Sequence, residues 1–192
     1  MKRLTLILTI ILIFSFSIQS YAASRHEQRA EIQKIETTTL NNLYKKHPYA
    51  RTEINKAVGY AVFSSATLAV GFFSGSYGHG IAHNNLNNHE TYMNMAAAGV
   101  GFGLGAKDFR VIFIFNNPNS FNDFVKTGLD LSGNADLAVK QGAKGGAVSG
   151  AEDVLPGVKI YQMTETGLLA QVMLKGTKYW RDNDLNQRNK NN

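Results

Sequence analysis

The sequence predicts an α+β domain: a glycine-rich, strongly bent antiparallel sheet or partial β-barrel, with an N-terminal amphipathic helix and a short second helix. Two contrasting stretches support this prediction. Residues 25–47 contain neither glycine nor proline. All 18 glycines lie between Gly59 and Gly176, where short apolar runs alternate with the Gly, Asn and Ser breaks that are typical of strands and tight turns. The chain therefore divides into a helical N-terminal part and a strand-rich remainder.

The first 22 residues have the pattern of a secretory signal peptide. Residues 1–3 form a short basic segment that contains Lys2 and Arg3. Residues 4–18 are apolar apart from Thr and Ser, and small residues follow at Ser20 and Ala22. The apolar segment is short for a membrane span, although an uncleaved N-terminal anchor is the alternative. We expect cleavage before Ala23 and an exported protein, periplasmic in a Gram-negative cell and secreted otherwise.

Composition limits the classes of function. The chain has no cysteine, which excludes a lipid-modified N-terminal cysteine, thiol catalysis and cysteine metal sites. The full chain carries a net charge of +6, and without residues 1–22 it keeps 18 basic and 14 acidic residues, a net charge of +4. A positive balance favours anionic partners, and export argues against nucleic acid. The remaining length of about 170 residues suits one domain.

The N-terminal helix is predicted over residues 25–47, within a segment that we assign as 23–48. Its charged residues lie on the opposite face from an apolar stripe. Lys45 and Lys46 occupy its last turn, where cations suit the helix dipole, and Pro48 ends it. Such a stripe is normal for a helix packed on its own domain, and it also allows a helix to lie on a membrane surface. The stripe consists of Ile32, Ile35, Leu40, Leu43 and Tyr44, with Thr39 on the same side.

The remaining elements follow from apolar runs and turn signals. The run at 108–115 is aromatic and β-branched enough to lie deep in a sheet. Residues 119–129 begin with an Asn/Ser cap and predict the short second helix. The polar tail at 187–192 is expected to be frayed. Strands are predicted at 58–64, 68–75, 80–84, 90–98, 108–115, 159–165 and 168–176, the last two as a hairpin around Thr166-Gly167.

The segment "AAAGVGFGLGAKDFRVIFIF" at 96–115 superficially fits a dinucleotide-binding fingerprint. That fingerprint requires its glycine turn to lead into a helix whose N-terminus holds the pyrophosphate. Here the glycines lead into a predicted strand, so we expect no nucleotide. Their spacing of two predicts that Gly99, Gly101, Gly103 and Gly105 lie on one face of a strand, where they form a packing surface.

Other constellations of reactive residues are weak. His79, His83 and His89, with Glu90 adjacent, could supply zinc ligands, but they lack the spacing of a known motif and the Gly and Asn residues around them favour a hairpin. No nucleophile elbow is present, and residues 142–146 lack the Lys-Ser/Thr end of a phosphate loop. Trp180 suits either a membrane interface or the end of a core strand. We therefore expect no enzyme, no metal and no cofactor.

The order of these segments resembles the SYLF-domain family. The segment "INKAVGYAVFSSATLAVGFFSGSYGHGIA" resembles the family's opening, and "GVGFGLGAKDFRVIFIFNN" resembles its Gly-x-Gly strand and the strand that follows. The segment "LSGNADLAV" is similar to its Leu-Gly-Gly-Asp-Ala segment, and "IYQMTETGLLAQVMLKGTKYWRDNDLN" parallels its closing hairpin. The resemblance covers roughly 54–186, within an assigned domain of 49–186. The chain departs from the pattern at Asn134 and at Lys140-Gln141.

The resemblance implies a lipid-binding module. SYLF relatives associate with anionic phospholipids, phosphoinositides in eukaryotes, partly through a basic N-terminal amphipathic helix, and some eukaryotic relatives bind actin. The expected function is non-enzymatic binding of anionic phospholipid or phosphoinositide-like membrane surfaces in the bacterial envelope. The alternative is an acyl-chain carrier, or a structural module that binds another envelope protein. The expected lipid-binding residues are Lys34, Lys45, Lys46, Arg51 and Lys56, with Lys140 and Lys144 as the next candidates.

Overall fold

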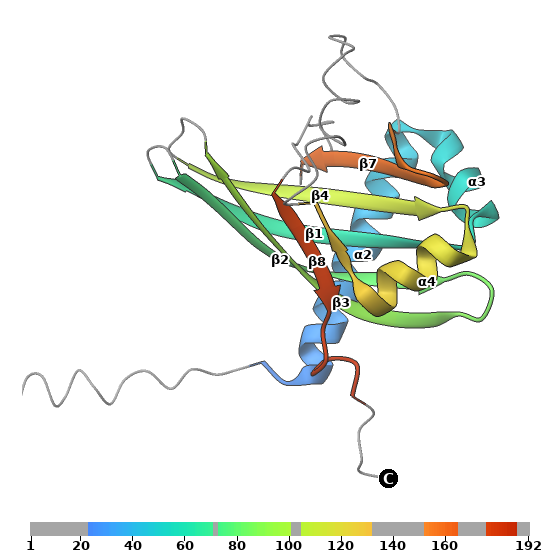
Figure 1. Ribbon diagram of the computed structural model, residues 1–192, viewed down its shortest axis with the longest axis horizontal. Helices are drawn as coiled ribbons and strands as arrows, with labels where there is room; N and C mark the ends of the chain where they lie inside the picture. The colour runs from blue at the N-terminus through green and yellow to red at the C-terminus, as the bar shows by residue number, and fades with distance from the viewer. Residues whose placement is uncertain (1–22, 71–72, 101–104, 132–151, 165–175, 188–192) are drawn as a thin grey trace, which may run out of the picture.

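An eight-stranded antiparallel sheet, curved into a half-barrel, forms the centre of the fold in this computed structural model (Figure 1). An α+β fold with an N-terminal helix is therefore confirmed. The structure describes residues 23–70, 73–100, 105–131, 152–164 and 176–187. The predicted signal peptide at 1–22, the segment that contains Lys140 and Lys144, and most of the predicted strand at 168–176 lie outside these residues.

The described helices and strands succeed one another as a helical pair, a block of four strands, a helix and four shorter strands. The helices are α2 (Arg25–Lys46), α3 (Pro48–Lys56) and α4 (Pro118–Thr127). The strands are β1 (Gly59–Val70), β2 (Phe73–Asn84), β3 (His89–Val100), β4 (Gly105–Phe115), β5 (Leu129–Asp130), β6 (Glu152–Leu155), β7 (Val158–Thr164) and β8 (Thr177–Arg181). Across the sheet their order is β5-β8-β3-β2-β1-β4-β7-β6.

The position of β4 corrects the prediction for the glycine run. Gly99 lies near the end of β3 and Gly105 begins β4, and β2 and β1 lie between these two strands in the sheet. The four glycines therefore do not lie on one face of a single strand, and Gly101 and Gly103 fall outside the described residues. The run does lead into a strand and not into a helix, as expected.

The first two strands are longer than predicted. Two strands of 12 residues each replace the three short ones expected at 58–64, 68–75 and 80–84. The sequence predicts that a strand begins at Gly80, but this residue lies inside β2, where Phe63 of β1 packs over it. A Cβ at this position would lie 2.5 Å from the Val62 carbonyl oxygen and would overlap the Phe63 ring. The glycine here marks a close approach between strands and not a turn.

The N-terminal helix ends where the sequence predicted, but a second helix follows at once. Ser24 caps α2: its Oγ accepts from the Glu27 N–H at 3.2 Å, while a Glu27 side-chain oxygen accepts from the Ser24 N–H at 2.7 Å. Pro48, expected only to stop this helix, also starts α3, because proline is well suited to the first turn of a helix. None of the helices in the described ranges is both long and apolar enough to span a membrane.

Helices cover both faces of the sheet, with α4 in front of it and α2 behind it in Figure 1. Strand β4 supplies the core on both sides, which explains its unbroken apolar run. Val111, Phe113 and Phe115 pack with α4, whereas Ile112 and Ile114 pack with α2 and α3. The α4 face is rich in aromatic rings, which belong to Phe63, Phe113, Phe115, Phe121, Phe124 and Tyr179. The predicted helix at 119–129 is confirmed as α4.

Candidate functional site

Four of the five expected lipid-binding residues occupy adjoining turns of α2 and α3. Lys45 and Lys46 end α2, Arg51 and Lys56 lie on α3, and all four are exposed. We call Lys45, Lys46, Arg51 and Lys56 the basic surface. The fifth residue, Lys34, is also exposed but lies three helical turns earlier on α2, beside a groove.

The acidic residue nearest to the basic surface turns inward. Residues 37–89 contain one acidic residue, Glu53 of α3. One carboxylate oxygen of Glu53 accepts from Lys159 Nζ at 2.8 Å and the other accepts from the Tyr161 hydroxyl at 2.7 Å. Partial burial acts to raise the pKa of Glu53, but these two hydrogen bonds and the positive charge of Lys159 together outweigh it and lower the pKa below its ordinary value. Lys159 and Tyr161 of β7 thus compensate the negative charge of Glu53, so this carboxylate does not offset the positive charge of the basic surface.

An aromatic ring orders part of the basic surface. The Arg51 guanidinium lies 4.4 Å from the centre of the Tyr44 ring, within the range of a cation–π contact. Tyr44 is half-buried and packs against the core on the α2 face. Because this contact joins the last turns of α2 to α3, it fixes the position of a cation without neutralising it.

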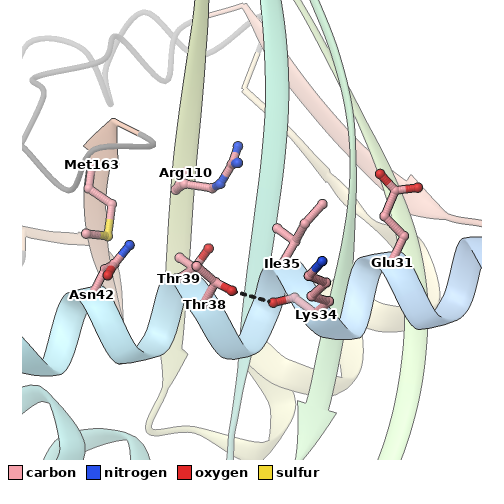
Figure 2. Close-up of a pocket in the computed structure, with 8 residues that line it drawn as sticks. All are labelled: Glu31, Lys34, Ile35, Thr38, Thr39, Asn42, Arg110 and Met163. Atoms are coloured by element: carbon pink, nitrogen blue, oxygen red, sulfur yellow. Dashed lines mark hydrogen bonds between the residues drawn. The ribbon is translucent and has the colours of Figure 1, made fainter.

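A groove of about 300 Å³ runs between α2 and strands β4 and β7 (Figure 2). Its lining is mixed, with cations from Lys34 and Arg110, the carboxylate of Glu31 and several uncharged polar groups. Arg110 donates to the Ser64 hydroxyl of β1, and the Thr38 hydroxyl donates to the Lys34 carbonyl at 2.9 Å. The lining residues are Glu31, Lys34, Ile35, Thr38, Thr39, Asn42, Arg110 and Met163.

A titratable cluster that the sequence did not predict lies beneath α2. Glu36 is only 8% exposed and accepts from the Tyr60 hydroxyl at 2.8 Å. The Tyr60 ring stacks on His83 at 5.3 Å between centres, and His83 Nδ1 lies 4.0 Å from a carboxylate oxygen of Glu90. Glu90 also accepts from the Gln33 amide at 2.9 Å. The cluster therefore ties α2 to strands β1, β2 and β3 by polar contacts.

One feature of the sequence, the spacing of Glu36 from the apolar residues of the helix, could have indicated this cluster. Glu36 stands four residues after Ile32 and four before Leu40, so it occupies the apolar stripe itself. Burial raises the pKa of Glu36; the Tyr60 hydrogen bond and His83 act to lower it, and Glu90 raises it further. Because burial outweighs the favourable contacts, the ionised carboxylate destabilises the packing of α2.

Replacing Glu36 with glutamine should make stability less dependent on pH. Because the pKa of Glu36 is higher in the folded than in the unfolded chain, its favourable contribution is complete below its ordinary value of 4.5 and is lost as the pH rises through the folded value. Glutamine cannot ionise and still accepts from Tyr60. We expect Glu36→Gln to raise the melting temperature at pH 7 and to leave it little changed at pH 4.

Glu31→Gln serves as the matched control, since it removes one carboxylate from an exposed position of the same helix. It should change the melting temperature little at either pH. The measurement is the melting temperature of the wild type and of both variants between about pH 4 and pH 7. A Glu36→Gln variant less stable than wild type at pH 7 would contradict the assignment of Glu36 as a costly buried charge.

The three histidines do not converge on one point. His79 bonds to the Asn94 side chain at 3.0 Å, His83 faces Glu90, and His89 is exposed at the start of β3. Within the described ranges, no group of three or more histidine or acidic side chains is placed to hold a metal ion. The predicted hairpin around these residues is formed by β2 and β3, which pair along their full length from Asn84–His89 to Phe73–Val100.

Two comparisons with known proteins identify relatives of this chain. Residues 96–189 match the family model of Ysc84, described as "Las17-binding protein actin regulator". The chain is also 32% identical over 161 residues to beta cell expansion factor A of Aeromonas veronii, an alignment that covers 84% of this chain. It spans 60% of the length of that relative. Together, the match over 96–189 and a relative aligned along most of the sequence show that this chain belongs to the Ysc84 (SYLF) domain family.

Proposed function

We propose that this protein binds anionic phospholipid surfaces without catalysing a reaction, and that the basic surface makes the contact. Family membership supports a lipid- or protein-interaction function and a non-enzymatic binding or regulatory role. The observation that carries the lipid proposal is the electrostatic arrangement around α3. Four exposed cations lie between Lys45 and Lys56, and the one carboxylate among them, on Glu53, is bonded to Lys159 and Tyr161.

Cations arranged in this way favour an anionic membrane for a physical reason. Each basic residue near an anionic surface contributes about 1 kcal/mol of attraction, and the attraction decays within a Debye length. Raising the salt concentration from about 0.1 M to about 1 M shortens that length from about 10 Å to about 3 Å. Binding through the basic surface should therefore weaken strongly with salt.

The proposal places the protein outside the cytoplasm, after removal of residues 1–22. Its support is the sequence pattern: a basic start, an apolar stretch and small residues at Ser20 and Ala22. N-terminal sequencing of the exported protein should find Ala23 first, or a residue one or two positions away. An intact Met1 on exported material would contradict this part of the proposal.

Vesicle flotation tests the lipid proposal. The exported protein is mixed with vesicles of phosphatidylcholine alone or of phosphatidylcholine with phosphatidylglycerol, at low and at high salt. We expect flotation with the anionic vesicles at low salt, a marked loss at high salt and no flotation with neutral vesicles. Equal flotation with both compositions would overturn the electrostatic mechanism, and no flotation at all would overturn the lipid function.

Protein interaction is the second candidate, because the matched family model is described as binding a protein, Las17. The same surface would then contact an acidic protein of the envelope. An acyl-chain carrier gains less support from the groove beside α2, whose lining includes two apolar side chains, Ile35 and Met163, among six polar or charged ones. Absence of flotation would favour the protein-binding alternative.

A further inference from the structure

Two large apolar side chains in the described part of the chain stand almost fully in solvent. Tyr49 is 86% exposed and Leu86 is 74% exposed, compared with 53% for Tyr77, the other large apolar side chain that is strongly exposed. A single exposed leucine is common in soluble proteins. What needs an explanation is where Tyr49 and Leu86 lie relative to each other and to the basic surface.

Both side chains lie at the end of the sheet that carries the basic surface. Tyr49 is the second residue of α3, two residues before Arg51, and it shares a helix face with Lys56, seven residues on. Leu86 lies in the β2–β3 turn. Figure 1 shows α3 and this turn at the same end of the sheet.

Hydrogen bonds fasten the β2–β3 turn to α3. The Asn85 side-chain amide donates to the Ile54 carbonyl at 2.7 Å and to the Ala57 carbonyl at 3.0 Å, and the Asn85 N–H donates to the Val58 carbonyl at 2.9 Å. Ala57 directly follows Lys56 in the chain. The turn that carries Leu86 is therefore held against the C-terminal end of α3, where Lys56 lies.

The turn also holds Leu86 in a defined position. The Asn84 side chain accepts from the Leu86 N–H at 2.9 Å, and the Asn87 side chain accepts from the His89 N–H at 3.0 Å. Asn88 has a positive φ of 55°, a conformation that asparagine tolerates. A preformed turn loses little conformational entropy when its apolar tip becomes buried in a partner.

We propose that Tyr49 and Leu86 insert into the interfacial layer of an anionic bilayer while the basic surface contacts the lipid headgroups. This inference rests on the proposed function and adds the residues that enter the membrane. Tyrosine is enriched where membrane meets water, because its ring is apolar and its hydroxyl is polar. The cations near Tyr49 and Leu86 favour an anionic bilayer over an apolar protein face, because an anionic bilayer supplies negative charges across the whole contact.

Single fluorophores test the insertion directly. The chain has no cysteine, so Leu86→Cys and Tyr49→Cys each create one labelling site for an environment-sensitive dye such as NBD. Tyr77→Cys is the matched control, since Tyr77 is also an exposed aromatic residue but lies midway along β2. With phosphatidylglycerol-containing vesicles, we expect a blue shift and an intensity increase at positions 49 and 86, and no change at position 77.

Alanine variants separate insertion from electrostatics. Tyr49→Ala with Leu86→Ala should lower the partition onto anionic vesicles about tenfold, by a similar factor at low and high salt, because the loss is apolar. The melting temperature should stay unchanged, since both side chains are exposed.

The outcomes distinguish the two proposals. Vesicles that bind the protein without any dye response at 49 and 86 would overturn the insertion and leave the proposed function standing. Equal responses at 49, 77 and 86 would also overturn it, because they would indicate no particular orientation. A protein that stays off vesicles of both compositions would overturn both proposals and leave this surface to a protein partner.

Discussion

Replacing Phe113 with alanine should lower the free energy of unfolding by about 3–5 kcal/mol, the usual range for removing a buried phenylalanine ring. Phe113 is fully buried near the C-terminal end of β4. For a domain of this size, each kcal/mol shifts the melting temperature by about 2–4 °C. The expected drop is therefore about 10 °C, measurable by calorimetry or circular dichroism.

The size of this effect follows from the rings around Phe113. Its centroid lies 5.0 Å from the ring of Tyr179, 5.2 Å from that of Phe124 and 5.9 Å from that of Phe63. The neighbours come from β8, α4 and β1, so the ring joins both halves of the sheet to the helix that covers it. An alanine would leave a cavity between three separate elements, and all three would have to move to fill it.

Tyr179→Phe is the matched control in the same cluster. The Tyr179 hydroxyl is buried and has no hydrogen-bond partner in the described part of the chain. Removing it keeps the ring and relieves an unsatisfied polar group, so stability should stay equal or rise. A Phe113→Ala variant that melts like wild type would show that the aromatic cluster is not the main core of this face.

The elements that the sequence predicts well are those with strong local signals. The helix at 25–47 has an apolar stripe and contains neither glycine nor proline, and the strand at 108–115 has the unbroken apolar run that is typical of a strand covered on both faces. The sequence divides the long strands β1 and β2 wrongly, because Ser65 and Gly78 look like turn residues locally. Their role is set by the partner strand: Ser65 pairs with Gly78, and a Cβ on that glycine would lie 2.7 Å from Ser65 Cα.

The candidate site was predictable only in part for the same reason. Charge and helix position were enough to select Lys45, Lys46, Arg51 and Lys56. Nothing local indicated that Glu53 would bond to Lys159 and Tyr161, more than a hundred residues away in the sequence. The fastening of the β2–β3 turn to α3 through Asn85 is likewise a contact that only the folded chain creates.

Reversing the charges of Lys45 and Lys46 should weaken binding to anionic vesicles more than tenfold. Removing two cations loses about 2 kcal/mol of attraction, and the two new carboxylates add repulsion. Since 1.4 kcal/mol corresponds to a factor of ten, the loss exceeds tenfold. The measurement is flotation of Lys45→Glu with Lys46→Glu at low and high salt. The difference from wild type should shrink at high salt, and flotation with neutral vesicles should not change.

A second charge reversal controls for net charge and for the helix dipole. Lys126→Glu with Lys178→Glu changes the net charge equally, and Lys126 occupies the last turn of α4 as Lys45 and Lys46 occupy that of α2. Both control residues are exposed, and the ion pair of Lys178 with Asp130 is a surface pair of small value. This control should lose much less binding than the test variant, with melting temperatures confirming that both fold. Equal losses in the two variants would mean that net charge, and not the basic surface, drives binding. Wild-type binding by the test variant would remove the helix from the lipid site and leave Lys140 and Lys144 as the next cations to reverse.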